Sequence, residues 1–185
     1  KPFLGVLLTY PETADESSMT RKVAAPGAVG TARQSVRVGV LGAGNYAQAV
    51  FLPAMRKTGQ TELVGIATAS GLSAQHTARR YGFRYASTSD EEVLNDPDIN
   101  CVAILTRHQH HARQVVTALE HQKAVYCEKP LAINQEELDT IKAAIAKQDG
   151  AVLTVGFNRR FAPMAQQMHE FYASRSEPML VQYRV

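Results

Sequence analysis

The sequence has few cysteines and little net charge. Its 185 residues include 2 cysteines, and the formal net charge at pH 7 is +3. Cys101 and Cys127 each lie in a strand-like apolar run, which favours buried, reduced thiols in a cytoplasmic protein over a disulfide or a metal site. The small charge gives no indication of a basic surface that binds nucleic acid.

Long apolar runs are also absent. The longest, such as "VGVLGAG" and "CVAIL", fall far short of the roughly 18 to 20 residues that a membrane-spanning helix needs. No secretory signal opens the printed sequence. Because it starts at Lys1 and stops at Val185 within an apolar alternating run, we expect a piece of a longer protein.

From Val36 onward, short apolar runs alternate with segments of helical length, which predicts strands joined by crossover helices. The strands are expected at "VRVGVLG", "ELVGIAT", "FRYA", "NCVAIL", "AVYC" and "AVLTVGF". Several are apolar at nearly every position, as parallel strands covered on both faces must be. The pattern therefore predicts an α/β fold with a doubly wound, mostly parallel sheet.

The two ends of the chain have a different composition. Residues 2–10 resemble a strand, and residues 11–35 are aperiodic and rich in Ala, Gly, Ser, Thr and Pro, which is typical of a linker. A helix is expected over 161–174 and a further strand over 179–185. The predicted division is an N-terminal strand and linker (1–35), a dinucleotide-binding domain (36–158), and a helix and first strand of a truncated second domain (159–185).

Local signals mark several helix ends. Ser89 with Glu92, in "SDEE", predicts a capping box for a short helix, and Asn134 with Glu137 predicts the cap of a longer one. Pro53 lies inside the first predicted helix, where it removes a backbone donor, so we expect a kink there.

The first strand runs into "GAGNYA", which opens a helix. Gly42 permits a tight turn, Gly44 lets the backbone approach a pyrophosphate, and the small Ala47 lets the helix pack on the strand. A plain strand-to-helix turn would also explain the glycines, but the strand and helix alternation that follows favours dinucleotide binding. The residues assigned to the cofactor here are Gly42, Ala43, Gly44, Asn45, Tyr46 and Ala47.

The end of the second strand lacks the acidic residue that holds a ribose 2′-hydroxyl in many such folds. Thr68 takes that place, with Ser70 close behind. A 2′-phosphate would meet hydroxyl donors instead of a repelling charge, so the cofactor is NADP or NAD, with NADP slightly favoured. Arg79 and Arg80 could assist, although a solvated helix face explains them more simply.

Four stretches resemble the Gfo/Idh/MocA family of oxidoreductases: "VGVLGAGNYAQAVFLPA", "AILTRHQHHARQ", "ALEHQKAVYCEKPLA" and "VGFNRRFAP". The triplet Glu128-Lys129-Pro130 is the most specific mark of this resemblance, which covers about residues 36–185. It implies a Rossmann domain that binds NAD or NADP, and a second, mostly antiparallel domain that holds a sugar, cyclitol or polyol and usually a catalytic histidine. It also implies possible homo-oligomers, formed through that second domain.

The resemblance places the triplet lysine, Lys129, near the nicotinamide and the substrate hydroxyl. An ammonium there can hydrogen-bond the oxygen of the carbon that loses the hydride. Glu128 could orient the ammonium or complete a relay, and Pro130 would end the strand and turn both side chains toward the cleft. All three residues are also assigned to the cofactor. An exposed ion pair after a strand is the alternative interpretation.

The fourth strand ends in "TRHQHH", where the family pattern reads roughly Thr-Pro-Asn-x-x-His. Thr106 and His111 match that pattern, whereas Arg107 and His108 replace the proline and asparagine. All four are assigned to the cofactor, with Arg107 as a phosphate or ribose contact. A metal site is not expected, because neighbouring histidines on one turn rarely converge on one ion.

Arg159, after the sixth strand, is assigned to cofactor or substrate, although interdomain packing would also explain it. The resulting hypothesis is an NAD(P)-dependent oxidoreductase whose fragment binds cofactor but turns over little substrate. One alternative is a non-catalytic NAD(P)-sensing regulator or scaffold, like the yeast galactose-pathway repressor of this family. Another is a Rossmann-like domain that binds S-adenosylmethionine or coenzyme A.

"FLGVLLTYPE", near the start of the chain, resembles the end of a zinc-dependent alcohol dehydrogenase-like module. That resemblance suggests a larger fusion with such a module upstream. A plain N-terminal extension that adds an edge strand is an equal alternative.

Overall fold

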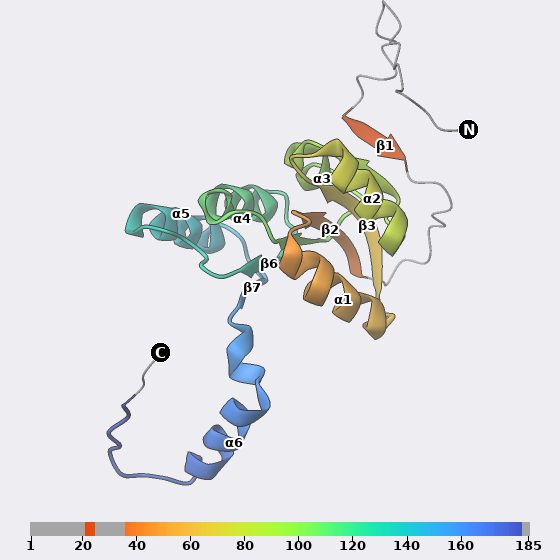
Figure 1. Cartoon of the computed structure of the whole chain (residues 1–185). Helices are drawn as coiled ribbons and strands as arrows, with labels where there is room; N and C mark the ends of the chain where they lie inside the picture. Colours follow the sequence, from red (N-terminus) through yellow and green to blue (C-terminus); the bar gives the residue numbers. More distant parts are fainter. Residues whose placement is uncertain (1–20, 25–35, 183–185) are drawn as a thin grey trace, which may run out of the picture.

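The computed structural model describes residues 21–24 and 36–182, which form a seven-stranded sheet with helices on both faces (Figure 1). The strand order is β1-β4-β3-β2-β5-β6-β7, and only β1 runs antiparallel to its neighbour. The predicted α/β fold with a doubly wound, mostly parallel sheet is confirmed. The strands are β1 (Lys22–Ala24), β2 (Val36–Leu41), β3 (Thr61–Ala67), β4 (Tyr85–Ser87), β5 (Cys101–Ile104), β6 (Ala124–Glu128) and β7 (Leu153–Gly156).

The helices follow the strands in the predicted alternation. The α-helices are α1 (Leu52–Thr58), α2 (Gly71–Tyr81), α3 (Asp90–Leu94), α4 (His111–Glu120), α5 (Gln135–Ala146) and α6 (Pro163–Tyr172). Three shorter helical turns are η2 (Ala47–Phe51), which is a π-helix, and the 3₁₀ turns η3 (His108–His110) and η4 (Asn158–Phe161).

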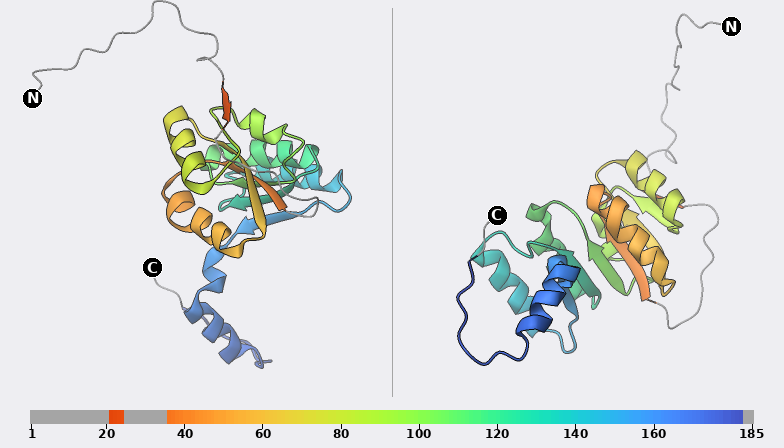
Figure 2. Two further views of the ribbon diagram at one scale, coloured as in Figure 1. Left: turned by 90° about the vertical axis from the view of Figure 1, so that its right-hand side faces the viewer. Right: turned by 60° about the horizontal axis from the view of Figure 1, so that its bottom comes forward.

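Apolar clusters cover both faces of the sheet, as the apolar strands require. On one face, Val40 and Ile66 pack with residues of α1 and α2. On the other, Leu41, Val64 and Ile104 pack with residues of α3, α4 and α5. Figure 2 shows these two helix layers on either side of the sheet.

The order of the strands reverses between β2 and β5. From β2 the chain proceeds outward through β3 and β4, and it then returns to β5 and proceeds the other way through β6 and β7. In sheets of this kind a crevice opens at the carboxyl ends of the strands next to that reversal. The glycine loop follows β2 directly, so it lies at this crevice.

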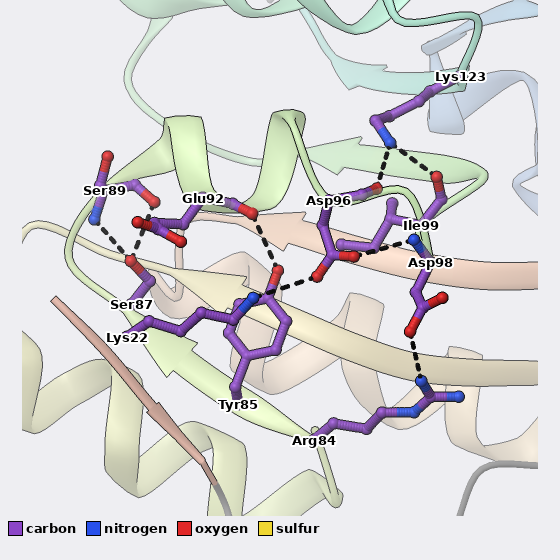
Figure 3. Close-up of polar contacts among 10 residues, drawn as sticks. All are labelled: Lys22, Arg84, Tyr85, Ser87, Ser89, Glu92, Asp96, Asp98, Ile99 and Lys123. Carbon is purple, nitrogen blue, oxygen red and sulfur yellow. Dashed lines mark hydrogen bonds and ion pairs between the residues drawn. The ribbon is translucent and has the colours of Figure 1, made fainter.

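Part of the predicted linker is a strand. β1 pairs antiparallel with β4, with Lys22 opposite Ser87, so the linker prediction is wrong for residues 22–24. Lys22 Nζ lies 3.9 Å from the ring centroid of Tyr85 and 3.5 Å from Asp96 Oδ2 (Figure 3). An unpaired sheet edge can recruit a segment that has no apolar period, because the pairing uses backbone groups. The strand predicted over 2–10 lies outside the described residues.

One of the two predicted caps forms. Asn134 Oδ1 accepts a hydrogen bond of 2.8 Å from the amide of Glu137, which confirms the cap of α5. The capping box of Ser89 with Glu92 is wrong, because the Ser89 side chain makes no cap hydrogen bond. Instead, Ser87 Oγ accepts from the Ser89 amide at 2.9 Å, so a turn ahead of α3 fixes the entry to the helix.

The distortion expected at Pro53 is a change of helix type. The amide of Leu52 donates to the carbonyl of Ala47, which closes the π-helical turn η2. Pro53 follows directly, so its missing N–H falls where the chain changes from the π-helix to the α-helix.

Beyond β7, α6 extends away from the sheet (Figure 1) and exposes Met164, Met168 and Phe171. The strand predicted over 179–185 is wrong for residues 179–182, which have no regular secondary structure; residues 183–185 lie outside the described part. An alternating pattern forms a strand only beside a partner, and no strand of the described residues pairs with this segment.

Candidate functional site

The glycine loop has the backbone geometry that its sequence predicts. Gly42 has a φ of +97°, and a Cβ there would lie 2.6 Å from the carbonyl oxygen of Leu105, so only glycine fits. Its amide donates to the carbonyl of Ala67 at 2.8 Å, which ties the loop to the end of β3. A Cβ at Gly44 would meet nothing within 4 Å, so the loop is open on the side from which a ligand can approach.

Of the cavities at the carboxyl ends of the strands, two concern the predicted coenzyme site. The β3-side cavity measures about 290 Å³, and the residues that matter for its chemistry are Thr68, Asp90, Thr106, His110, Arg113 and Gln114. The β7-side cavity measures about 410 Å³, and its polar lining residues are Tyr46, Glu128, Lys129, Asn158, Arg159 and Arg160. The glycine loop reaches the β7-side cavity through Tyr46.

The hydroxyls at the end of β3 are already engaged locally. Thr68 Oγ1 donates to the carbonyl of Ser70 at 2.7 Å, and Ser70 Oγ accepts from the amide of Ser73 at 3.5 Å at the start of α2. Thr68 lines the β3-side cavity, whereas Ser70 is not among the residues that line it. Thr68 is therefore the better placed of the two predicted residues to meet a ligand.

The β3-side cavity also contains a fixed carboxylate that the sequence analysis missed. Arg113 Nη2 and Gln114 Nε2 both donate to Asp90 Oδ2, the latter at 2.8 Å. Burial acts to raise the pKa of Asp90, but the bonds from Gln114 and Arg113 outweigh it and leave the pKa below its ordinary value. Asp90 and Arg113 are 23 residues apart in the chain, so no local sequence pattern indicates that they meet.

His111 has an internal position. It is fully buried, with Nδ1 2.7 Å from the carbonyl oxygen of Pro130 and Nε2 3.1 Å from that of Thr106. It therefore connects the end of β5 with the turn after β6, and its assignment to the cofactor stays a prediction. Arg107 and His108 are exposed at the start of the same turn.

The triplet lies at the end of β6. Lys129 is exposed and lines the β7-side cavity, and the bond from Lys129 to Pro130 is cis. Glu128 Oε1 accepts hydrogen bonds from Tyr126 Oη at 2.7 Å and from Asn158 Nδ2 at 2.9 Å. No ion pair within 4 Å joins Glu128 and Lys129, so the carboxylate leaves the ammonium available.

Tyr126, Gly156 and Asn158 complete this end of the site. A Cβ at Gly156 would lie 2.5 Å from Glu128 Oε1 and 2.6 Å from Tyr126 Oη, so glycine makes room for that contact. The pKa of Tyr126 is raised by burial and by its hydrogen bond to Glu128, which keeps the phenol a neutral donor. Tyr126, Gly156 and Asn158 meet around Glu128 because β6 pairs with β7, which brings Glu128 opposite Gly156.

Both cysteines, Cys101 and Cys127, are free thiols. Burial raises the pKa of Cys127 to about 12. Among the described residues, no three His, Cys, Asp or Glu side chains are grouped to hold a metal ion. Over the same part of the chain, no helix combines the length and the apolar character needed to cross a membrane.

A glycine loop at the reversal point of a parallel sheet is the arrangement of a dinucleotide-binding Rossmann fold, and here Lys129 lies at a nearby strand end. The sequence profile of the oxidoreductase family with an NAD-binding Rossmann fold, Gfo/Idh/MocA, matches residues 36–157. The chain therefore belongs to the Gfo/Idh/MocA family.

Curated relatives include dehydrogenases and reductases of sugars and polyols. The chain is 32% identical over 137 residues to 1,5-anhydro-D-fructose reductase of Ensifer adhaerens, covering 74% of this chain and 40% of the relative. It is 37% identical over 90 residues to the NAD(+)-dependent scyllo-inositol 2-dehydrogenase of Bacillus subtilis, covering 49% and 26%. This chain thus spans at most about two-fifths of the length of these two relatives.

A solved structure gives the same picture of the fold. A 3-ketoreductase from Actinomadura kijaniata, in complex with NADP, superposes with a TM-score of 0.69 at 25% identity. The match covers 76% of this chain and 44% of that protein. Binding of NAD or NADP is therefore the property that fold, family and neighbouring structure share.

Proposed function

We propose that the chain is the coenzyme-binding part of an oxidoreductase that transfers a hydride between a nicotinamide and a sugar- or polyol-like hydroxyl or carbonyl group. One observation carries this proposal: a single cavity is lined by Tyr46 of the glycine loop and by Lys129 of the triplet. A ligand whose diphosphate lies on the loop can therefore extend toward an unpaired ammonium.

The loop amides and the β3-side cavity would hold the diphosphate and the adenosine. The open space above Gly44 admits the diphosphate, and the exposed Arg159 and Arg160 add positive charge beside the β7-side cavity. When bound, the nicotinamide supplies the hydride acceptor or donor. Lys129 donates a hydrogen bond to the substrate oxygen and stabilises the negative charge that develops on it.

NADP is the favoured coenzyme in this proposal. Thr68 brings no negative charge to the end of β3, and the guanidinium of Arg113 lies in the same cavity. Asp90 is also present, but Arg113 and Gln114 already occupy one of its oxygens. A 2′-phosphate would therefore meet a hydroxyl and a cation at this end of the site.

We also propose that turnover requires residues outside this chain, because it spans at most about two-fifths of the relatives described above. Four further points stay predictions: the identity of the substrate, an oligomer formed through a second domain, a cytoplasmic location, and an upstream zinc-dependent dehydrogenase-like module. Residues 1–20, which carry the last of these, lie outside the described part.

Titration of the chain with NADPH and NADH tests the proposal. Coenzyme fluorescence and calorimetry should show saturable binding of at least one coenzyme, and S-adenosylmethionine and coenzyme A should not bind. Gly44→Asp should abolish binding without unfolding the chain, because its side chain has room but repels a diphosphate. Ala143→Asp, on the exposed face of α5, adds the same charge away from the site and should bind normally. Tight binding of either control ligand, with none of NADPH or NADH, would contradict the proposal.

A further inference from the structure

Four polar side chains from three distant segments meet at the β7-side cavity. We call Tyr46, Tyr126, Glu128 and Asn158 the Glu128 cluster. Asn158 Nδ2 lies 2.8 Å from Tyr46 Oη and 2.9 Å from Glu128 Oε1, so one amide links the glycine loop to the end of β6. Tyr126 Oη donates to the same carboxylate oxygen at 2.7 Å.

The surroundings of the cluster are shaped for this contact. Gly156 leaves space that any larger residue would take from Glu128 Oε1 and Tyr126 Oη. The Tyr126 ring also packs against Phe51, with a centroid separation of 5.1 Å, which fixes the direction of its hydroxyl. The carboxylate is thus held by neutral donors on a rigid strand rather than by an ion pair with Lys129.

The hydrogen bonds leave one carboxylate oxygen unused. Both donors bind Oε1, and no residue within 21–24 and 36–182 donates a hydrogen bond to Oε2. Glu128 lines the cavity that Tyr46 and Lys129 share. An ionised carboxylate only accepts hydrogen bonds, so the free oxygen suits a ligand N–H or O–H group.

We propose that Tyr126 and Asn158 are positioning residues that hold Oε1 of Glu128, so that Oε2 accepts a hydrogen bond from the nicotinamide half of the coenzyme. This inference rests on the proposed function and adds a specific contact to it. The donor is either the carboxamide N–H or a hydroxyl of the adjoining ribose. Charge-assisted bonds of this kind are stronger than neutral ones, so loss of the support should be measurable in affinity.

Tyr126→Phe and Asn158→Ala test the proposal in the full chain. Tyr126→Phe removes one oxygen and keeps the packing on Phe51, and Asn158 is exposed, so its truncation should be tolerated even if the first variant is unstable. Each variant should bind NADH or NADPH about tenfold more weakly, as expected for one lost bond to a charged group. Affinity for ADP, or its 2′-phosphorylated form, should stay unchanged because that ligand ends at the diphosphate.

ADP-ribose and the 3-acetylpyridine analogue of the coenzyme identify the donor. A ribose hydroxyl donor predicts that the variants also weaken ADP-ribose, whereas a carboxamide donor predicts that they leave ADP-ribose and the acetylpyridine analogue unaffected. Either pattern supports the inference. Tyr85→Phe in β4, which removes a tyrosine hydroxyl bonded to the carbonyl of Glu92 in α3, is the matched control and should retain full affinity.

Two results would overturn the inference. Unchanged dinucleotide affinity in Tyr126→Phe and Asn158→Ala would show that the cluster does not position a ligand contact. An equal loss for ADP and for the dinucleotide would show a general structural effect instead. If the wild-type chain binds neither coenzyme, the proposed function fails first and this inference fails with it.

Discussion

The two cavities at the carboxyl edge of the sheet hold their carboxylates in different ways. In the β3-side cavity, Asp90 is paired with the guanidinium of Arg113 and bonded by Gln114. In the β7-side cavity, Glu128 is bonded by a phenol and an amide, and the ammonium of Lys129 has no carboxylate partner within 4 Å among the described residues. In the first arrangement one guanidinium nitrogen offsets the carboxylate and the other nitrogens can still bind a phosphate, which suits binding. The second keeps a cation available, which suits chemistry on a developing oxyanion.

The largest effect should come from removing the free cation. Lys129→Ala, made in the longer protein that carries the substrate-binding part, should lower kcat by about 100-fold or more, because a positioned donor to the reacting oxygen is lost. Coenzyme affinity should change little. Steady-state kinetics with a polyol panel and a parallel coenzyme titration measure both quantities. An unchanged kcat would show that Lys129 takes no part in the reaction. The proposed difference between the two cavities would then be wrong.

Gly42→Ala should unfold or distort the loop that both cavities share. The added Cβ clashes with Leu105 at a backbone φ of +97°, so we expect the free energy of unfolding to fall by about 2 to 4 kcal/mol. Urea denaturation measures this loss. Gly44→Ala is the control, since its Cβ meets no atom within 4 Å and should cost less than about 1 kcal/mol. Equal stability of the two variants would contradict the assigned loop geometry.

Thr68→Asp should sharpen the assignment of the β3-side cavity to the adenosine end. A carboxylate at the end of β3 would repel a 2′-phosphate, so the ratio of NADP to NAD affinity should fall by about 10-fold. Competitive titration with both coenzymes measures that ratio. Ser70→Asp is a useful comparison, because Ser70 does not line the cavity and should change the ratio less. A larger effect at Ser70 would place the ribose elsewhere.

The smallest effect should come from breaking the ion pair between Asp90 and Arg113. The pKa of Asp90 is lowered in the folded chain, so its stabilising contribution is present above the ordinary carboxyl pKa of about 4 and is lost as the pH falls below that value. Asp90→Asn should reduce the free energy of unfolding by about 1 kcal/mol at pH 7 and by less at about pH 3. Urea denaturation at the two pH values measures this difference. Asp96, whose pKa is also lowered, supplies a matched second site. A deficit that stays constant with pH would contradict the pairing.

The sequence predicted those parts of the site that depend on local patterns. The glycine loop, the triplet and the strand alternation each occupy a few consecutive residues, so their spacing carries the information. The Glu128 cluster depends instead on the register of β6 with β7, which brings Asn158 to a carboxylate 30 residues earlier. Asp90 and Arg113 meet for a similar reason, because α3 and α4 lie on the same face of the sheet.

Errors in the predicted elements have related physical causes. β1 lies within an aperiodic stretch, and its pairing with the edge of β4 uses backbone groups that composition does not report. The predicted capping box at Ser89 does not form, and the Ser89 amide donates instead to the Ser87 side chain two residues earlier. The sequence pattern that assigns His111 to the cofactor gives no sign that its ring is buried between Thr106 and Pro130, so that assignment stays a prediction.

A crystal structure of the chain with bound NADPH tests the central claim most directly. The account predicts the diphosphate on the amides after Leu41, the adenosine beside Thr68 in the β3-side cavity, and the nicotinamide in the β7-side cavity within reach of Lys129. A coenzyme bound in the opposite direction, or a nicotinamide away from Lys129, would contradict it.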